Sequence, residues 1–426
     1  MLSQGAAPGT GDSSSPFYIN HAPDFTFLTT SIDDQDPGGT FQVAATVTDT
    51  DTSDQADEIY IYVCSSNDWS TTTGCAATEW CSGTSTDATG GDIINCSFAT
   101  TTPALDGTWD YYGFVKDWHD LASADNSRTA TYTVNNVAPE LANVELQSNN
   151  DITLNMKTMS EVPASTTSAN ITDDNSCMDI VSATGTIYVS DVVDEQFCDN
   201  DPNDCYQIPE TQCTYVAGSC TGHDDIDATY ICTTTLKFHT IASEAGGSNP
   251  DGVNEWLGAI TAVDDDGLKG TGTTTAGSGV QVNQLLAIEV YVTTPGEADS
   301  EITYGSIRGG QDTGDFNATT TVENYGNVPM DATIDVSDMI RDTNDNYIDA
   351  VNQEFDIVNF TYGLGSYAIA TTSADQLVDT VTAKPTDEAV AVNDEVYWGI
   401  GIPGGTLSGD YAGTNTYVAT LDVSDW

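Results

Sequence analysis

The chain has 426 residues, of which 8 are Lys or Arg and 66 are Asp or Glu, so its formal net charge is -58. A surface of this sign repels phosphates and anionic headgroups, which argues against nucleic acids and anionic membranes as partners. It attracts hard cations such as Ca²⁺, which bind carboxylate and carbonyl oxygens. The alternative explanation of the acids is solubility or adaptation to a salty medium.

The length and the apolar content predict several packed domains. Hydrophobic residues make up 38% of the chain, and the length suffices for about three domains of roughly 100–200 residues. No apolar run reaches the roughly 18 residues of a membrane span. Residues 1–8 lack the basic start and apolar centre of a signal peptide, so we expect the numbering to begin inside a longer precursor.

A short string occurs twice and divides the chain. Residues 20–25 (NHAPDF) and 136–141 (NVAPEL) share the pattern Asn-x-Ala-Pro-acid-apolar, and each follows a predicted strand. Proline fixes φ and pushes the preceding residue to an extended geometry. We interpret the string as a stiff joint between tandem modules. The predicted domains are a flexible arm (1–15), a module with four cysteines (16–137), a module with six (138–284) and a cysteine-free module (285–426).

Short strands separated by turns recur along all three modules. In chain order they are 41–48, 58–63, 109–115 and 128–134, then 185–189 and 256–264, then 285–292, 317–324, 332–336, 397–402 and 416–423. Residues 317–336 are interpreted as a hairpin turning at 325–327, and one short helical turn is expected near 374–377. This pattern predicts an all-β fold of tandem immunoglobulin-like β-sandwich domains with disulfide-rich insertions.

The ten cysteines favour disulfides and an oxidising compartment. No C-x-x-C pair occurs, which argues against zinc and redox sites. They lie within two stretches, 64–96 and 177–232, which we interpret as irregular insertions that need cross-links. The pairing stays open, because four cysteines allow about three connectivities and six about fifteen. The predicted disulfide residues are Cys64, Cys75, Cys81, Cys96, Cys177, Cys198, Cys205, Cys213, Cys220 and Cys232.

Acidic residues follow several strands and are candidate Ca²⁺ ligands. Loops at one end of a sandwich converge, so carboxylates there can share an ion. A solvated acidic rim is the alternative. The candidates at strand ends are Asp49, Asp51, Asp54, Asp117, Asp120, Asp264 and Asp266.

A further candidate lies in the third module. Asp342, Asn344 and Asn346 have the D-x-N-x-N spacing of a calcium loop. Position six is Tyr347, where an EF-hand requires Gly, so we predict a loose Ca²⁺ loop rather than an EF-hand. An Asp/Asn-rich turn is the alternative.

No enzyme signature occurs. The chain has no G-x-S-x-G elbow, no phosphate loop and no G-x-G-x-x-G after a strand. None of its four histidines forms a ligand pair at a recognised spacing, and His119 is interpreted as a loop residue. We therefore expect no catalytic activity.

The joints, together with residues 47–51 (VTDTD) and 263–267 (VDDDG), resemble immunoglobulin-like and cadherin-like modules of bacterial cell-surface proteins. Residues 322–327 (VENYGN) resemble a hairpin of β-sandwich domains in cell-wall and S-layer proteins. The joints lack the full acid-Asn-acid string of cadherins, so cadherin-type joint calcium does not follow. The resemblance implies a surface coat or fibre protein without catalytic residues.

These observations lead to one leading hypothesis and one alternative. The first is an extracellular, cell-surface structural protein that assembles with copies of itself into an S-layer-like lattice or fibre, with Ca²⁺ bridging acidic sites. The alternative is an adhesin or stalk that binds another cell or a glycan of the cell envelope or of a host. Polymerisation of the purified chain would separate them.

Overall fold

The computed structural model describes residues 19–51, 58–86, 91–157, 165–190, 198–243, 255–275, 277–295, 301–364, 367–368 and 376–422. The chain divides into two compact units. Unit 1 consists of Met1–Val137, Asp173–Asp179 and Thr221–Ile226, and unit 2 of Ala138–Thr172, Ile180–Cys220 and Asp227–Trp426. The predicted arm (1–15) and Asp54 lie outside the described residues.

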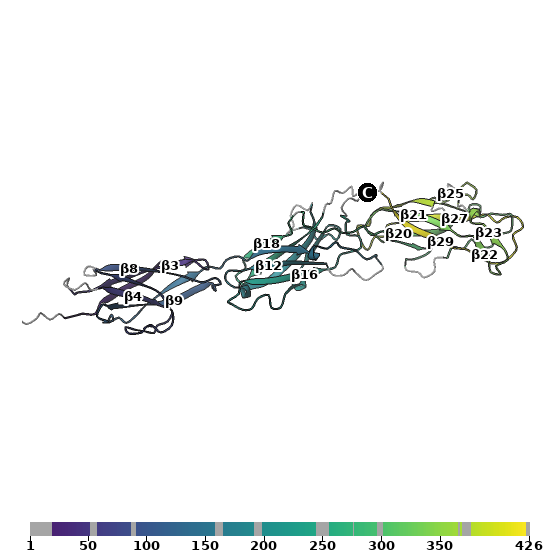
Figure 1. The fold of residues 1–426 in the computed structure, drawn as a ribbon. Helices are drawn as coiled ribbons and strands as arrows, with labels where there is room; N and C mark the ends of the chain where they lie inside the picture. Colours follow the sequence, from purple (N-terminus) through teal and green to yellow (C-terminus); the bar gives the residue numbers. More distant parts are fainter. Residues whose placement is uncertain are drawn as a thin grey trace, which may run out of the picture. The chain divides into compact units, whose positions relative to one another are not determined.

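Unit 1 contains a sandwich of two sheets, which we call the first sandwich (Figure 1). Neighbouring strands run antiparallel, except that β2 and β10 are parallel. One sheet has the order β1 (Asp24–Ile32), β3 (Thr40–Thr48), β8 (Asp92–Ala99). The other has the order β2 (Asp34–Gln35), β10 (Arg128–Val134), β9 (Gly107–Asp117), β4 (Ile59–Cys64), β7 (Glu79–Ser85), and β5 (Trp69–Ser70) pairs with β6 (Gly74–Cys75).

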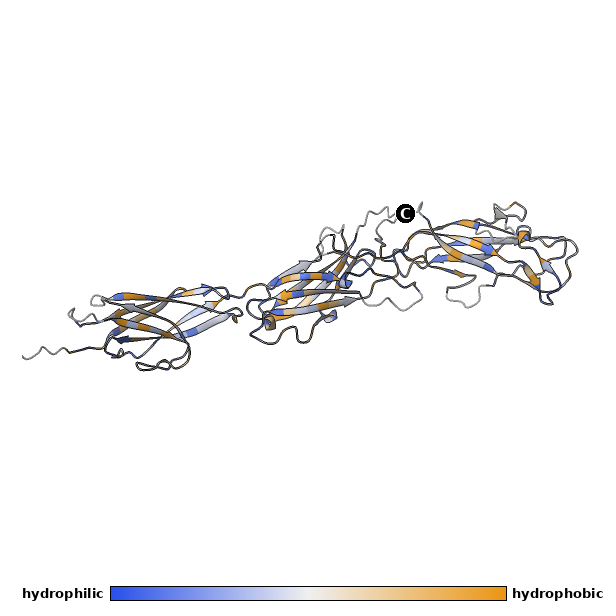
Figure 2. Cartoon of the chain, in the orientation of Figure 1, coloured by the Kyte–Doolittle hydropathy of each residue, from blue (hydrophilic) through white to orange (hydrophobic). Residues whose placement is uncertain are grey.

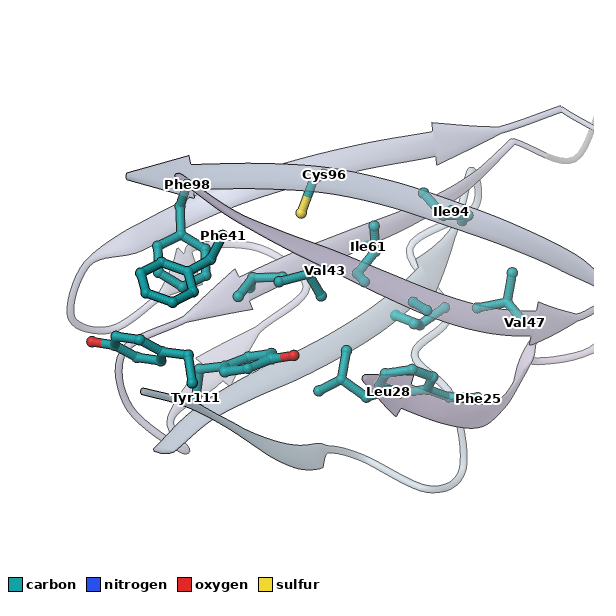
Figure 3. Packing of buried hydrophobic residues seen from close by; sticks show 14 of the residues in the cluster. Phe25, Leu28, Phe41, Val43, Val47, Ile61, Ile94, Cys96, Phe98 and Tyr111 are labelled. Atoms are coloured by element: carbon teal, nitrogen blue, oxygen red, sulfur yellow. The ribbon is translucent and has the colours of Figure 1, made fainter. Parts of the chain in front are cut away.

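The core of the first sandwich follows the two-residue period of its strands. Phe41, Val43, Ala45 and Val47 on β3 are fully buried, whereas the residues that alternate with them are more exposed. They face Ile61 on β4 and Tyr111 on β9 across the space between the sheets (Figure 3). Alternate side chains of a strand point to opposite faces, so this pattern alone places one face of β3 in the core. Figure 2 shows the same interleaving of apolar and hydrophilic residues along the strands.

The cysteines are paired, as predicted, but the stretch 64–96 is more regular than expected. It carries β7 and β8, which belong to opposite sheets. Cys81 on β7 and Cys96 on β8 form a disulfide that cross-links the two sheets, and Cys64 pairs with Cys75. Ile94 and Phe98 on β8 are buried at alternate positions, so the two-residue period was present. Cys96 continues this buried face, and Asn95 and Ser97 lie on the exposed one.

Unit 2 contains two further groups of sheets. The second sandwich has one sheet in the order β11 (Glu140–Leu146), β12 (Ser165–Thr172), β16 (Asp227–Thr234), β15 (Cys213–Tyr215). Its other sheet has the order β14 (Cys205–Ile208), β13 (Ile180–Val189), β17 (Trp256–Asp264), β18 (Lys269–Thr273). The predicted irregularity of 177–232 is therefore also wrong in part. Disulfides join Cys198 to Cys205 and Cys213 to Cys232, and Cys177 and Cys220 are disulfide-bonded as well.

The third sandwich is free of cysteine. Its sheets have the orders β19 (Ile288–Tyr291), β20 (Ala318–Asn324), β27 (Asn393–Ile400), β24 (Gln353–Asp356), β25 (Tyr367–Ala368), and β26 (Gln376–Thr382), β21 (Met330–Val336), β29 (Asn415–Leu421). A small sheet has the order β23 (Tyr347–Ile348), β22 (Met339–Arg341), β28 (Tyr411–Ala412). Trp398 fills the core, and its indole nitrogen donates to Thr320 Oγ1 (3.0 Å).

Two predictions for the third sandwich are wrong. β20 and β21 do not pair as a hairpin, because they belong to different sheets and the chain crosses between the layers at residues 325–329. Of the helical turn expected near 374–377, residues 374 and 375 lie outside the described residues, and Gln376 and Leu377 begin strand β26. In the described residues, the helical elements are three-residue 3₁₀ turns, η1 (Gln147–Asn149), η2 (Cys177–Asp179), η3 (Glu210–Gln212) and η4 (Ala350–Asn352). The all-β, tandem β-sandwich prediction is confirmed.

None of the helices among these described residues has the length and apolar character needed to cross a bilayer.

Candidate functional site

The segments that lead into each sandwich are held by acidic or amide side chains. We call residues 20–23, 136–139 and 284–287 the lead-in segments, because β1, β11 and β19 follow them directly. In each segment one backbone N–H, three residues before the strand begins, is bound by a side chain from a distant loop. We call these three side chains, Asp51, Asn175 and Asn327, the clamp residues.

The first clamp residue is an aspartate. Asp51 Oδ2 accepts the backbone N–H of His21 (2.6 Å), and Asp51 Oδ1 lies 2.5 Å from His21 Nδ1. Asp49 Oδ1 accepts the N–H of Asp51 (3.0 Å), which shapes the loop after β3. The hydrogen bond to Asp51 raises the pKa of the exposed His21 ring. Asp49 and Asp51, predicted as metal ligands, thus lie together at the first lead-in segment.

Asp117 holds the same segment from the end of β9. Its side chain is fully buried. Oδ1 accepts the backbone N–H groups of His119 and Leu121 (both 2.8 Å), and Oδ2 accepts Asn20 Nδ2 (2.6 Å). Both oxygens of this predicted ligand are therefore bound by N–H donors. Asp120 has a positive φ of 63° and pairs with Lys116 Nζ (2.6 Å) at the surface.

The second clamp residue, Asn175, is fully buried and lies in unit 1. Its Oδ1 accepts the N–H of Val137 (2.8 Å). Its Nδ2 donates to the carbonyls of Asn135 (3.0 Å) and Ala104 (3.1 Å). Asp173 Oδ1 accepts the N–H of Asn175 (2.9 Å), as Asp49 does for Asp51. One amide thus bonds the backbone on both sides of Asn136.

The third clamp residue, Asn327, repeats this geometry within unit 2. Its Oδ1 accepts the N–H of Leu285 (2.7 Å), and its Nδ2 donates to the carbonyls of Asn283 (3.2 Å) and Thr240 (3.0 Å). Asn327 is fully buried. Because Thr240 lies between β16 and β17 of the second sandwich and Asn327 follows β20 of the third, this side chain ties two sandwiches together. A buried amide with every hydrogen bond made fixes one backbone arrangement.

Basic residues gather at the same place. Three of the eight Lys and Arg residues lie there: Lys157, Lys237 and Lys384. Lys157 Nζ is 2.7 Å from Oε1 of Glu323, whose side chain is 1% exposed. The Tyr291 hydroxyl donates to Glu323 Oε2 (3.1 Å). In so acidic a chain, an ion pair to a buried and fully bonded carboxylate is a specific contact.

Further contacts extend this junction within unit 2. Lys384 Nζ donates to Asn203 Oδ1 (2.8 Å), and Asn203 Nδ2 donates to the carbonyl of Thr386 (2.8 Å). Lys237 lies 3.1 Å from Glu388. An apolar cluster of Ala242, Val328 and Met330 packs beside them. Polar ties and apolar packing therefore stabilise the same junction.

Two further candidate ligands, Asp264 and Asp266, belong to one loop and strand end. Asp264 is buried at the end of β17, where Oδ1 accepts the N–H of Leu268 (2.7 Å), and Asp266 is exposed. This loop repeats the Asp117 loop, since the fourth residue of each, Asp120 or Gly267, has a positive φ. The loops after β9 and β17 therefore share a local conformation.

The predicted calcium loop is the turn of a β-hairpin. Asp342, Asn344 and Asn346 lie between β22 and β23, and Asn344 has a φ of 56°. Asn346 Oδ1 accepts the Tyr411 hydroxyl (2.6 Å). Arg341 holds both oxygens of Asp345 (2.9 and 3.0 Å). A hydrogen bond from Thr343, and after it the bonds from Arg341, lower the pKa of that carboxyl.

Sequence reasoning missed two acids and two clamp residues. Asp173 and Asp179 are buried, and their carboxylate oxygens lie within 4.8 Å of each other. The signal was the string Asp173-Asp174-Asn175, which follows β12 as Asp49-Thr50-Asp51 follows β3. The same comparison would have identified Asn175, and the string at 324–327 would have identified Asn327.

The fold and these contacts define a tandem β-sandwich protein whose lead-in segments are held by side chains of distant loops. No protein-family model and no curated protein matches the chain. A solved PKD domain of an M14-like peptidase from Thermoplasmatales archaeon SCGC AB-540-F20 is 18% identical, with a TM-score of 0.17, over 27% of this chain and 96% of that chain. The Yersinia pseudotuberculosis adhesin InvE is 12% identical, with a TM-score of 0.25, over 61% of this chain and 60% of its own.

Proposed function

We propose that the chain is an extracellular structural protein whose tandem β-sandwiches self-assemble into an S-layer-like lattice or a surface fibre. The observation that supports this proposal is the clamp at Asn327, which joins two sandwiches through a buried amide and lies beside the ion pair of Lys157 with the buried Glu323. A repeating assembly needs a fixed spacing between its parts. Hydrogen-bonded, buried junctions supply that spacing better than an open linker.

The disulfides support an extracellular location. Disulfides persist in oxidising environments and are rare in the cytosol. Cys81–Cys96 cross-links the two sheets of the first sandwich, and Cys213–Cys232 joins two neighbouring strands of the second. Such cross-links limit the unfolded chain and so resist mechanical or chemical unfolding.

Ca²⁺ is the proposed counter-ion of assembly. At a net charge of -58, copies of the chain repel each other until cations screen or bridge them. Asp51 and Asp117 fit a metal poorly, because their oxygens already accept N–H donors. Asp173 and Asp179 fit better, because two buried carboxylates within 4.8 Å of each other repel one another unless a cation lies near them.

Assembly can be tested directly. The purified chain is examined by sedimentation velocity and negative-stain electron microscopy in millimolar Ca²⁺, and again after chelation. Sheets or filaments that dissolve on chelation are the expected result. Sheets that persist in chelator would support self-assembly but contradict a role for Ca²⁺. Dispersed particles in both conditions would overturn the structural proposal.

An adhesin or stalk that binds a glycan is the second candidate, and one observation favours it. The core of the first sandwich opens into an aromatic-lined cavity. Dispersed particles that bind a glycan would support this candidate. Neither function includes a catalytic step, and we expect no turnover of substrates.

A further inference from the structure

The first sandwich has a cavity at one end of its core. Its volume is about 360 Å³, within the range of small-molecule sites. Trp80, Phe98, Trp109 and Tyr132 supply aromatic rings, and Thr100 and Thr101 supply hydroxyls. All of these residues belong to unit 1.

The rings are held in place by the sandwich itself. Trp80 stacks on Phe98 with ring centroids 4.7 Å apart and meets the edge of Tyr132 at 5.4 Å. Trp109 lies two residues before the buried Tyr111 on β9, so both side chains point to the core face of the sheet. Trp109 is nevertheless 43% exposed, because the core ends at this level. Its indole nitrogen donates to the carbonyl of Leu105 (3.3 Å), which orients the ring.

Tyr132 supplies a polar group that the fold leaves unused. Its side chain is 8% exposed, and burial raises the pKa of its hydroxyl, which therefore stays protonated at neutral pH. In the part of the chain that the structure describes, this hydroxyl forms no hydrogen bond. The oxygen is not among the buried side-chain atoms without a partner, so it is accessible to water at the cavity. A ligand that hydrogen-bonds to it can replace that water.

The lining selects the chemical class of the ligand. The negative faces of aromatic rings attract the partly positive C–H groups of a sugar ring, while hydroxyls bond its hydroxyls. The charge of -58 disfavours anionic ligands. An apolar ligand would leave the Tyr132 hydroxyl unpaired. A neutral saccharide satisfies both the rings and the hydroxyl.

We propose that this cavity binds a neutral glycan, with Trp109 as the stacking platform and the Tyr132 hydroxyl as a hydrogen-bonding group. This inference goes beyond the structural role and gives the glycan-binding candidate its site. It concerns one sandwich of a single copy, so its test does not depend on assembly.

The test uses the full chain in chelator, which keeps the proposed assembly apart from binding. A neutral-glycan array and calorimetry with cellohexaose, maltohexaose and chitohexaose measure affinity, and polygalacturonate serves as an anionic probe. Three variants are compared: Trp109→Ala, Tyr132→Phe and Trp118→Ala. Trp118 is 61% exposed on the same sandwich and does not line the cavity, so it is the matched control.

We expect at least one neutral glycan to bind and polygalacturonate not to bind. Trp109→Ala should weaken binding about tenfold or more, and Tyr132→Phe about five- to tenfold, the effect of one lost hydrogen bond. Trp118→Ala should leave affinity unchanged. Tyr132→Phe keeps the ring in the core, so it separates a lost contact from misfolding. The proposal is overturned if no neutral glycan binds, or if binding is the same in Trp109→Ala and Tyr132→Phe as in the wild type.

Discussion

Replacing Asn327 by Asp tests the clamp with almost no change in shape. The substitution keeps an oxygen for the N–H of Leu285 but removes both donors, and it places a carboxylate against the carbonyls of Asn283 and Thr240. Two buried carbonyls lose their partner at roughly 1–1.5 kcal/mol each. We therefore expect the junction to lose about 2–3 kcal/mol, a factor of about 30–150 in its opening equilibrium.

Hydrogen exchange of the Leu285 amide, with urea unfolding alongside, measures this loss. Protection of Leu285 should fall by that factor, whereas amides inside β9 of the first sandwich should be unaffected. The control is Asn150→Asp, because Asn150 is exposed and its amide bonds only local carbonyls. Equal protection in the Asn327→Asp and Asn150→Asp proteins would refute the clamp.

Three other predictions concern the ties described above. Lys157→Met should destabilise the junction by about 3 kcal/mol, because it leaves Glu323 buried and unpaired; urea unfolding measures this, and a loss no larger than that of the exposed Lys269→Met would contradict it. Burial and nearby Lys384 lower the pKa of His239 from its ordinary value of 6.5. Asp387, Glu388 and Lys237 also act on it. Below pH 6.5 the unfolded chain therefore binds more protons than the folded one, and stability falls as the pH falls. His239→Gln should reduce the dependence of the melting temperature on pH between pH 7 and 5. An unchanged dependence would show that other groups cause it. Replacing Cys81 and Cys96 by Ser removes the cross-link that closes a 15-residue loop, and should lower the free energy of unfolding by about 3 kcal/mol. An unchanged melting temperature of the first sandwich would show that the cross-link does not stabilise it.

The strands were predictable from local patterns. The predicted bounds 128–134 and 256–264 coincide with β10 and β17, because alternating apolar residues between turn signals define a strand without any tertiary information. The layer to which a strand belongs was not predictable in this way. The pattern of 317–336 is the same for a hairpin and for a crossing between sheets, so only the pairing partners of β20 and β21 separate them.

The candidate site was predictable in part. Acids at strand ends were identified, and Asp49, Asp51 and Asp117 do meet at a lead-in segment, although they bind N–H groups there. The clamp residues lie 30, 38 and 42 residues from the N–H groups they hold. Contacts across such distances depend on how loops converge, which a period in the sequence does not encode. The sequence signal for the clamp residues lies in the similarity of the three loops that follow β3, β12 and β20.

Electron microscopy of the wild-type and Asn327→Asp proteins in millimolar Ca²⁺ tests the central claim that clamped junctions set the spacing of an assembly. The account predicts ordered sheets or filaments with a regular repeat for the wild type, and irregular aggregates or dispersed particles for Asn327→Asp. Wild-type protein that stays dispersed, or an Asn327→Asp protein that forms the same ordered repeat, would contradict it.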